Sequence, residues 1–296
     1  TPNDTKPSTE IVNLGDTFGD DTQTMTFAER YFKVQHTDLL FADAAIFVEG
    51  TAERMIIPLF IERGFPELAK KYISFLDIGG SHAHRLRPLV GRLGIPTAII
   101  TDLDPVIPTK SENGRTVRTA VSIAGQADLE CGNETLTTWH PRLADFQAYG
   151  TPRPTELEWT SETGTKVRFA WQLPITSAGN QWPSTFEDAL VLTNIDWFRS
   201  LDSEVDETTG EKVKHRGTIG KVVGLVSDYP DHSELLKKLH EMLHGNFSKG
   251  DFSATIFERI LFDPRSYDQA LACPTYIAEA LTWLNNQLAA ANGETP

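Results

Sequence analysis

The sequence predicts an α/β protein built on a parallel sheet that is flanked by helices. Three strand-like segments alternate with two segments of helical pattern between residues 44 and 101, and only short connections separate them. A chain that repeats strand, helix and strand in this way forms parallel strands joined by crossover helices. Further helical segments follow toward the C-terminus, so additional helices are expected around this core.

The first strand is expected at Ala44–Val48, because this short run is wholly apolar and therefore typical of a strand buried on both faces. A helix from about Ala52 to Arg63 follows and ends at Gly64, a residue that commonly terminates helices. The second unit repeats this order, with a strand at 72–78, a helix at 81–93 that ends at Gly94, and a third strand at 97–101.

The rest of the chain divides by composition. Residues 1–25 are rich in Thr, Asp, Asn and Pro and are interpreted as a linker, and the capping-box pattern of Thr26 and Glu29 predicts a helix to about Leu40. Residues 26–105 and about 184–296 are assigned to the core with its helical additions, and 106–183 to an insertion beside it. Within that insertion a hairpin is expected from 155–160 and 165–172. The C-terminal helices are expected at 232–244, 251–262 and 274–290, after a charged loop at 201–217.

The charge and cysteine content exclude several classes. The 296 residues include 27 basic and 41 acidic side chains, a formal charge of −14, which argues against non-specific, charge-driven binding of nucleic acid by the chain alone. Two cysteines exclude a disulfide framework and predict a reducing, cytoplasmic location. The longest apolar runs are too short to span a membrane. The first residue is Thr1 rather than Met, which suggests a piece of a longer chain.

Four carboxylates follow strand ends, where ligands and catalytic groups gather in parallel sheets. Glu49 closes the first strand and Glu53 lies one helical turn later, while Asp102 and Asp104 leave the third strand two residues apart. Four carboxylates in one crevice repel each other unless cations are present, and Mg²⁺ or Mn²⁺ prefers oxygen ligands of this kind. Two such ions can hold the attacking and leaving oxygens of a phosphoryl transfer. Taken singly, Glu53 suits a helix N-terminus and Asp102 a turn, so each alone also has a structural interpretation.

These motifs resemble a known family. Val48-Glu49-Gly50-x-x-Glu53 after one strand and Asp102-x-Asp104 after a later strand resemble the TOPRIM domain of primases, topoisomerases and nucleases. Four further segments, in this order, are similar to the C-terminal nuclease region of class 2 OLD (overcoming lysogenization defect) proteins. They are Phe27-Ala28-Glu29-Arg30, Thr185-Phe186-Glu187-Asp188-Ala189-Leu190, Lys249-Gly250-Asp251-Phe252, and Tyr276-Ile277-Ala278-Glu279 with Trp283-Leu284.

The resemblance implies a metal-dependent DNA endonuclease or nickase with two divalent cations, Mg²⁺ or Mn²⁺, for which Ca²⁺ would be a non-catalytic substitute. It also implies an N-terminal ATPase domain that is missing from this chain, and a full-length protein that is dimeric. No phosphate-binding Gly-x-x-x-x-Gly-Lys-Ser/Thr motif is present, because Gly217-x-x-Gly220-Lys221 has the wrong spacing and Val222 replaces the hydroxyl residue. We therefore expect no ATP hydrolysis by this chain.

The resemblance also changes the interpretation of three residues. Ser184-x-x-Glu187 has the form of a capping box, which gives Glu187 a structural role, whereas the family pattern implies that Glu187, and with it Asp188, binds the second metal. Lys249 on its own suits a solvated surface charge. In the matching family segment this lysine is catalytic, and a cation there would stabilise the transition state. Glu49 is expected to serve as a base as well as a ligand.

Two alternatives come from other classes. His240-Glu241-Met242-Leu243-His244 matches the zinc hydrolase signature His-Glu-x-x-His, although His240, Glu241 and His244 lie off the apolar stripe of their helix and are expected to face water. A non-catalytic, Mg²⁺-dependent nucleic-acid-binding module would share the carboxylates without turnover. Asn133 with Thr137 and Thr138 suits either turn capping, which we favour, or contacts with a phosphate backbone.

Overall fold

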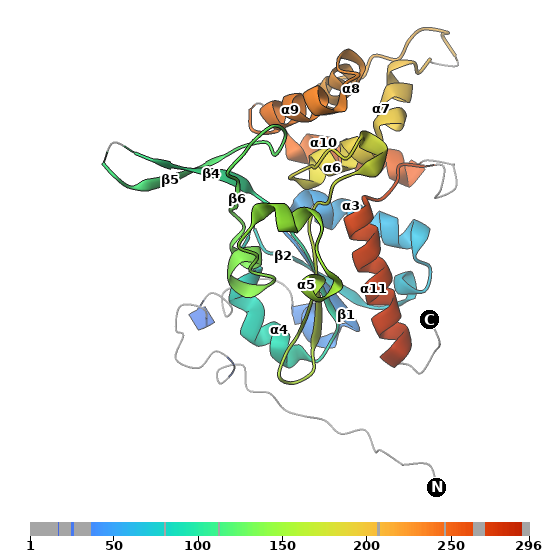
Figure 1. Cartoon of the computed structure of the whole chain (residues 1–296). Coiled ribbons are helices and arrows are strands. Elements are labelled where there is room, and N and C mark those ends of the chain that lie inside the picture. Colours follow the sequence, from blue (N-terminus) through green and yellow to red (C-terminus); the bar gives the residue numbers. More distant parts are fainter. Residues whose placement is uncertain are drawn as a thin grey trace.

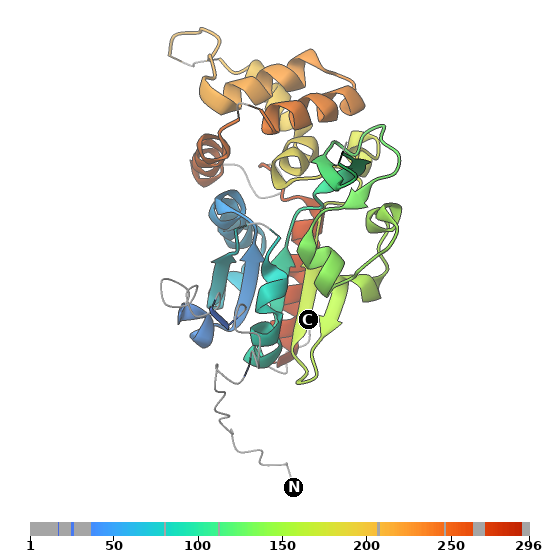
Figure 2. The ribbon, with the colours of Figure 1, turned by 90° about the vertical axis from the view of Figure 1, so that its left-hand side faces the viewer.

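The computed structural model describes residues 17, 25–26, 37–79, 81–111, 113–205, 208–245, 247–262 and 270–291. Its main sheet has five strands in the order β2-β1-β3-β8-β7, and the first four are parallel. The predicted α/β fold with a mostly parallel sheet is thus confirmed (Figures 1 and 2). The strands are β1 (Ala44–Val48), β2 (Ile73–Asp77), β3 (Thr97–Ile100), β7 (Glu158–Thr160) and β8 (Lys166–Ala170).

Strand β1 lies between β2 and β3, and all five of its side chains are buried, as its apolar run predicts. Successive side chains of a strand point to opposite faces, so β1 contributes to two separate cores. Ile46 and Val48 belong to one core, and Phe47 belongs to the other. Helices therefore cover both faces of the sheet, which is the normal arrangement for parallel strands.

Helix α3 (Thr51–Gly64) follows β1 and packs in the same core as α11 (Thr275–Ala291), which contacts β3 and β8. The other face is covered by η3 (Ala83–Leu86) and α4 (Arg87–Leu93). The helix expected at 81–93 is divided between these two elements, because Pro88 stands at the start of α4 and favours a new helical turn. It ends at Gly94 in a left-handed conformation, as expected.

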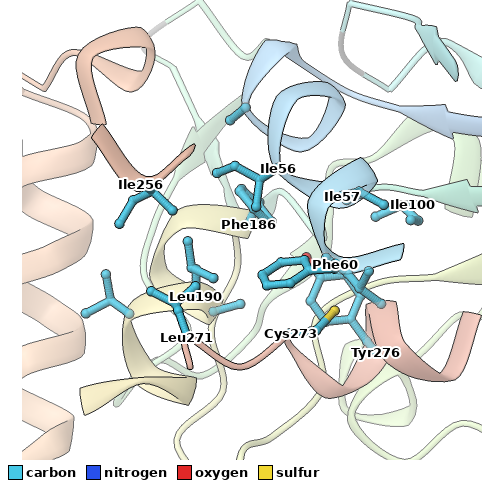
Figure 3. Close-up of a cluster of buried hydrophobic side chains, with 14 of the residues drawn as sticks. Ile56, Ile57, Phe60, Ile100, Phe186, Leu190, Ile256, Leu271, Cys273 and Tyr276 are labelled. Atoms are coloured by element: carbon cyan, nitrogen blue, oxygen red, sulfur yellow. The ribbon is translucent and has the colours of Figure 1, made fainter. Parts of the chain in front are cut away.

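A group of helices lies beyond the ends of the strands, at the top of Figure 1. Ile256 and Leu190 from this group pack with Phe60 and Tyr276, so helices far apart in the sequence share one core (Figure 3). The group comprises α6 (Phe186–Thr193), α7 (Ile195–Asp202), α8 (Gly217–Asp228), α9 (His232–Leu243) and α10 (Lys249–Phe262). The helices predicted at 232–244, 251–262 and 274–290 are confirmed, and so is the expectation that helices resume near Ser184, whereas α8 was not predicted. None of the described helices is both long and apolar enough to cross a membrane.

The segment 106–183 contributes to both parts of the structure. Strands β4 (Pro105–Lys110), β5 (Thr116–Ala120) and β6 (Glu130–Cys131) form a separate antiparallel sheet, from which the β4–β5 ribbon projects (Figure 1). The hairpin predicted from 155–160 and 165–172 is confirmed by the pairing of β7 with β8. Strand β8 also pairs in parallel with β3, so part of the predicted insertion belongs to the main sheet. The predicted linker 1–25 and the helix from Thr26 to about Leu40 lie largely outside the described residues.

Candidate active site

The carboxyl ends of β1 and β3 border a cavity of about 420 Å³. Five charged side chains line it, two that follow strands and three from different helices: Glu49, Glu53, Asp102, Glu187 and Lys249. A larger cavity of about 610 Å³ lies beside α7, and Asp196 is the only acidic residue among the described residues that line it. The smaller cavity is therefore the candidate site, since it alone combines strand ends with an acidic cluster.

The turn from β1 into α3 brings Glu49 and Glu53 together. Gly50 has an extended backbone and begins α3 without a side-chain cap. A Cβ atom at Gly50 would lie 3.3 Å from Glu53 Oε2, so the absence of a side chain lets that carboxylate pack over the turn. Glu53 is buried in the first turn of the helix, where the macrodipole favours a negative charge.

Asp102 is buried just after β3, whereas Asp104 is exposed and adopts a left-handed backbone conformation with φ of 47°. Aspartate tolerates this conformation better than most residues, and it redirects the chain from β3 into β4. The backbone N–H of Asp102 donates to Glu49 Oε1 at 3.1 Å, which joins the ends of the two strands. The structure therefore brings Glu49, Glu53 and Asp102 to one place, with Asp104 at its edge.

Burial and mutual repulsion disfavour the ionised forms of these carboxylates. Burial, reinforced by the charge of Asp104, raises the pKa of Glu49 to about 7. Burial, with the charge of Glu187, raises the pKa of Glu53 to about 8. The pKa of Asp102 is raised well above its ordinary value, first by burial and then by Glu49 and Glu53. Such shifts indicate a site where a bound cation would stabilise the ionised forms.

These shifts predict how the stability of the metal-free chain depends on pH. Glu49 and Glu53 hold protons in the folded chain that they release in the unfolded chain, whose ordinary pKa is 4.5. Their stabilising contribution is therefore complete below that value and is lost as the pH rises through about 7 and 8. We expect the melting temperature in EDTA to decrease between about pH 5 and pH 8. A Glu49→Gln/Glu53→Gln variant, followed by circular dichroism, should show a flatter profile; an equal slope would contradict the assignment.

Lys249 begins α10 and is the positive charge of the site. Its Nζ lies 3.0 Å from Glu187 Oε2, and the lysine side chain is 55% exposed while that of Glu187 is 3% exposed. Burial lowers the pKa of Lys249, but the charges of Glu187, Asp102 and Glu53 outweigh burial and raise it. Lys249 is thus a permanent ammonium directed at the acidic cluster rather than an isolated surface charge.

The start of α6 separates the roles of its two acidic residues. The capping box predicted for Ser184 and Glu187 is wrong: Thr185 and Asp188 form it. Asp188 is buried and accepts hydrogen bonds from the backbone N–H groups of Ser184 and Thr185, at 3.1 and 2.8 Å. Since both oxygens of Asp188 serve the helix start, Glu187 is left to face the cavity with Lys249.

The donor set fits hard divalent cations, because it consists of carboxylate oxygens. Within the described residues, no three His, Cys, Asp or Glu side chains are gathered closely enough to hold an ion in their present rotamers. Loading such a site would require the carboxylates to rotate inward, which is possible for side chains at the ends of strands and helices.

The segment from His240 to His244, which matches the zinc hydrolase signature, differs from its prediction in the burial of one residue. Glu241 and His244 are exposed, as expected, but His240 is half-buried, and burial together with His244 lowers the pKa of His240 to about 4. The rings of His240 and His244 lie against each other with centroids 4.0 Å apart. Glu241 Oε2 accepts from Lys238 Nζ at 2.7 Å. Zinc binding by this helix stays a prediction, and Glu241 would have to leave its ion pair to act as a base.

Comparison with known proteins shows what the segment that carries these strand ends is similar to. Residues 40–104 match the family described as "Overcoming lysogenization defect protein-like, TOPRIM domain". The chain contains an OLD-like TOPRIM domain. The predicted resemblance to the C-terminal TOPRIM region of OLD proteins is thereby confirmed. The matched residues run from β1 to just past β3 and include Glu49, Glu53, Asp102 and Asp104, whereas Glu187 and Lys249 lie outside them.

The TOPRIM domain and its surroundings also align with individual proteins. Endonuclease GajA of Bacillus cereus (strain HuB5-5) is 24% identical over 266 residues, which are 90% of this chain and 34% of that protein, so the chain spans about a third of this relative. The C-terminal region of the Burkholderia pseudomallei OLD protein has a TM-score of 0.45 at 23% identity, and the match covers 84% of this chain and 100% of that one. The corresponding region from Xanthomonas campestris pv. campestris has a TM-score of 0.39 at 19% identity over 86% of this chain and 99% of that one.

Proposed function

We propose that this chain is the nuclease part of a larger protein and hydrolyses phosphodiester bonds of DNA with the help of two divalent cations. The observation that carries the proposal is the convergence of buried carboxylates and one lysine on the cavity at the ends of β1 and β3. The OLD-like TOPRIM match over 40–104 and the alignment with an endonuclease support it.

The ligands in this proposal are Glu49, Glu53, Asp102, Asp104 and Glu187. Asp188 is left out, because the helix start uses its carboxylate. When bound, Mg²⁺ or Mn²⁺ would supply Lewis-acid chemistry at the attacking and leaving oxygens. Ca²⁺ would occupy the same oxygen ligands without supporting turnover.

The side chains then have distinct roles. Three donors, the backbone N–H of Asp102, the hydroxyl of Thr101 and the amide of Asn133, all bind Oε1 of Glu49. This leaves Oε2 available, so Glu49 can serve through this oxygen either as a ligand or as the base that accepts a proton from the attacking water. Lys249 faces the cluster from the start of α10 and stabilises the negative charge that develops on the phosphate.

The whole protein is needed for a complete account of DNA binding. A net charge of −14 opposes tight association of this chain with a polyanion. We therefore propose that the part of the protein outside this chain provides most of the DNA binding. The part proposed to be missing is an N-terminal ATPase that also makes the full-length protein dimeric. Cleavage by the chain alone should therefore be slow.

The direct test is plasmid nicking without ATP. Supercoiled plasmid incubated with the purified chain should be relaxed or linearised in Mn²⁺ or Mg²⁺, because the chain supplies all of the proposed ligands. It should remain intact in EDTA, and Ca²⁺ should not support cleavage. Highly pure chain that cleaves in none of these divalent metals would refute the proposal, and cleavage that requires added zinc would favour the helix with His240 and His244.

A further inference from the structure

Two buried carboxamide side chains face the acidic cluster from the segment 106–183. Asn133 follows β6 and Gln172 follows β8, and both are completely buried. They lie outside the residues matched by the TOPRIM family. Each donates through its amide nitrogen to a carboxylate of the candidate site, and each accepts a backbone N–H through its amide oxygen.

Gln172 holds Asp102. The N–H of Leu103 donates to Gln172 Oε1 at 3.1 Å, which fixes the orientation of the amide. Its Nε2 must then face the site, where it donates to Asp102 Oδ1 at 2.6 Å and also lies 3.3 Å from the hydroxyl of Tyr276. The indole of Trp182 donates to the backbone oxygen of Gln172 at 2.9 Å, so the backbone of Gln172 is held as well as its side chain.

Asn133 holds Glu49 in the same way. The N–H of Leu136 donates to Asn133 Oδ1 at 3.1 Å. Its Nδ2 lies 2.8 Å from each of three acceptors: Glu49 Oε1, the Thr101 hydroxyl and the Asp102 carbonyl. The amide thus joins the ends of β1 and β3.

Gly132 makes this reach possible, because its backbone passes close to Asp104. The N–H of Gly132 donates to the carbonyl oxygen of Asp104 at 2.8 Å. A Cβ atom at position 132 would lie only 2.6 Å from that oxygen. Any larger residue would therefore push the chain, and Asn133 with it, away from the strand ends.

We propose that Asn133 and Gln172 are positioning residues that fix Glu49 and Asp102 for metal binding, an inference that rests on the proposed nuclease function. A neutral donor suits this task, since it restrains a carboxylate without competing for the cation as a second ammonium would. Outer hydrogen-bond partners of metal ligands commonly change affinity or activity by about 10- to 100-fold when they are replaced. The segment 106–183 would then complete the site.

The test uses substitutions that keep the shape and the acceptor but remove the donor, Asn133→Asp and Gln172→Glu. The matched controls make the same chemical change at exposed positions, Asn180→Asp and Gln147→Glu. We expect the first pair to lower the cleavage rate at saturating Mn²⁺ by at least about tenfold and to change the Mn²⁺-induced rise in melting temperature. The controls should match the wild type in both. If Asn133→Asp and Gln172→Glu also match the wild type, the amides only cap turns and the proposal fails.

Swapped pairs in EDTA test the contacts without any reliance on nuclease activity. Gln172→Glu/Asp102→Asn and Asn133→Asp/Glu49→Gln exchange donor and acceptor across each hydrogen bond. We expect each double variant to melt at a higher temperature than the summed effects of its two single substitutions predict. Strict additivity of the two single substitutions would overturn the positioning role. If the wild type cleaves in no metal, the proposed function fails while these melting data still decide the contacts. If a single variant does not fold, a folded double variant supports the proposal and an unfolded one overturns it.

Discussion

Asp102→Ala and Glu49→Ala should each reduce the proposed metal-dependent DNA cleavage to near the background of the assay, while the chain stays folded. Each carboxylate is a proposed ligand at the end of a central strand, and two-metal catalysis does not tolerate the loss of one. The charge of Glu49 raises the pKa of Asp102 and of Glu53, and Asp102 is itself a buried carboxylate, so each substitution removes an unfavourable buried charge. The melting temperature in EDTA should therefore stay at, or rise above, that of the wild type. Single-turnover nicking and circular dichroism measure the two effects.

Glu241→Gln is the control for this pair, because Glu241 is exposed and pairs only with Lys238 among the contacts found for the described residues. It should keep wild-type cleavage. The opposite pattern, with cleavage lost in Glu241→Gln or His240→Ala and kept in Asp102→Ala, would move the active site to α9. Stoichiometric zinc in the purified chain would then be expected as well.

Lys249→Met should lower the single-turnover cleavage rate by about 10² or more, as for other preorganised groups that stabilise developing charge. The ammonium lies 3.0 Å from Glu187, and the surrounding carboxylates keep it protonated. The loss should appear in the chemical step, with metal and DNA affinity nearly unchanged. Lys249→Arg should rescue poorly, since a planar guanidinium does not replace a compact ammonium.

Lys238→Met is the matched control, because Lys238 forms an ion pair with Glu241 on the surface helix α9. Its rate should stay within a few-fold of the wild type. An equally small effect of Lys249→Met would return Lys249 to the role of a solvated charge. The proposed metal ions would then have to stabilise the transition state without it.

The local pattern of apolar residues was sufficient to predict the central strands. The apolar run Ala44–Val48 forms β1, and Gly64 and Gly94 end helices as expected. The carboxylates that follow β1 and β3 also converge as predicted, because parallel strands direct their carboxyl ends to one edge. These features depend on residues a few positions apart, and short-range pattern encodes them.

The ribbon β4–β5 was not predicted, because β4 contains Pro108, a residue that is unusual within strands, and all residues of β5 are exposed, so no buried face marks β5 as a strand. At the start of α6, two overlapping capping patterns differ by one residue, and only the backbone geometry selects Thr185 and Asp188. That choice is what frees Glu187 for Lys249.

The sequence by itself determined the α/β core and which carboxylates stand at its strand ends. Only the tertiary structure decided which polar side chains surround them. Asn133 and Glu49 are 84 residues apart, and Gln172 and Asp102 are 70 apart. Gln172 reaches the site because β8 pairs in parallel with β3, and Asn133 because Gly132 lets the backbone approach Asp104. Contacts over such separations depend on strand order and close packing, and neither can be predicted from local hydrophobic periodicity.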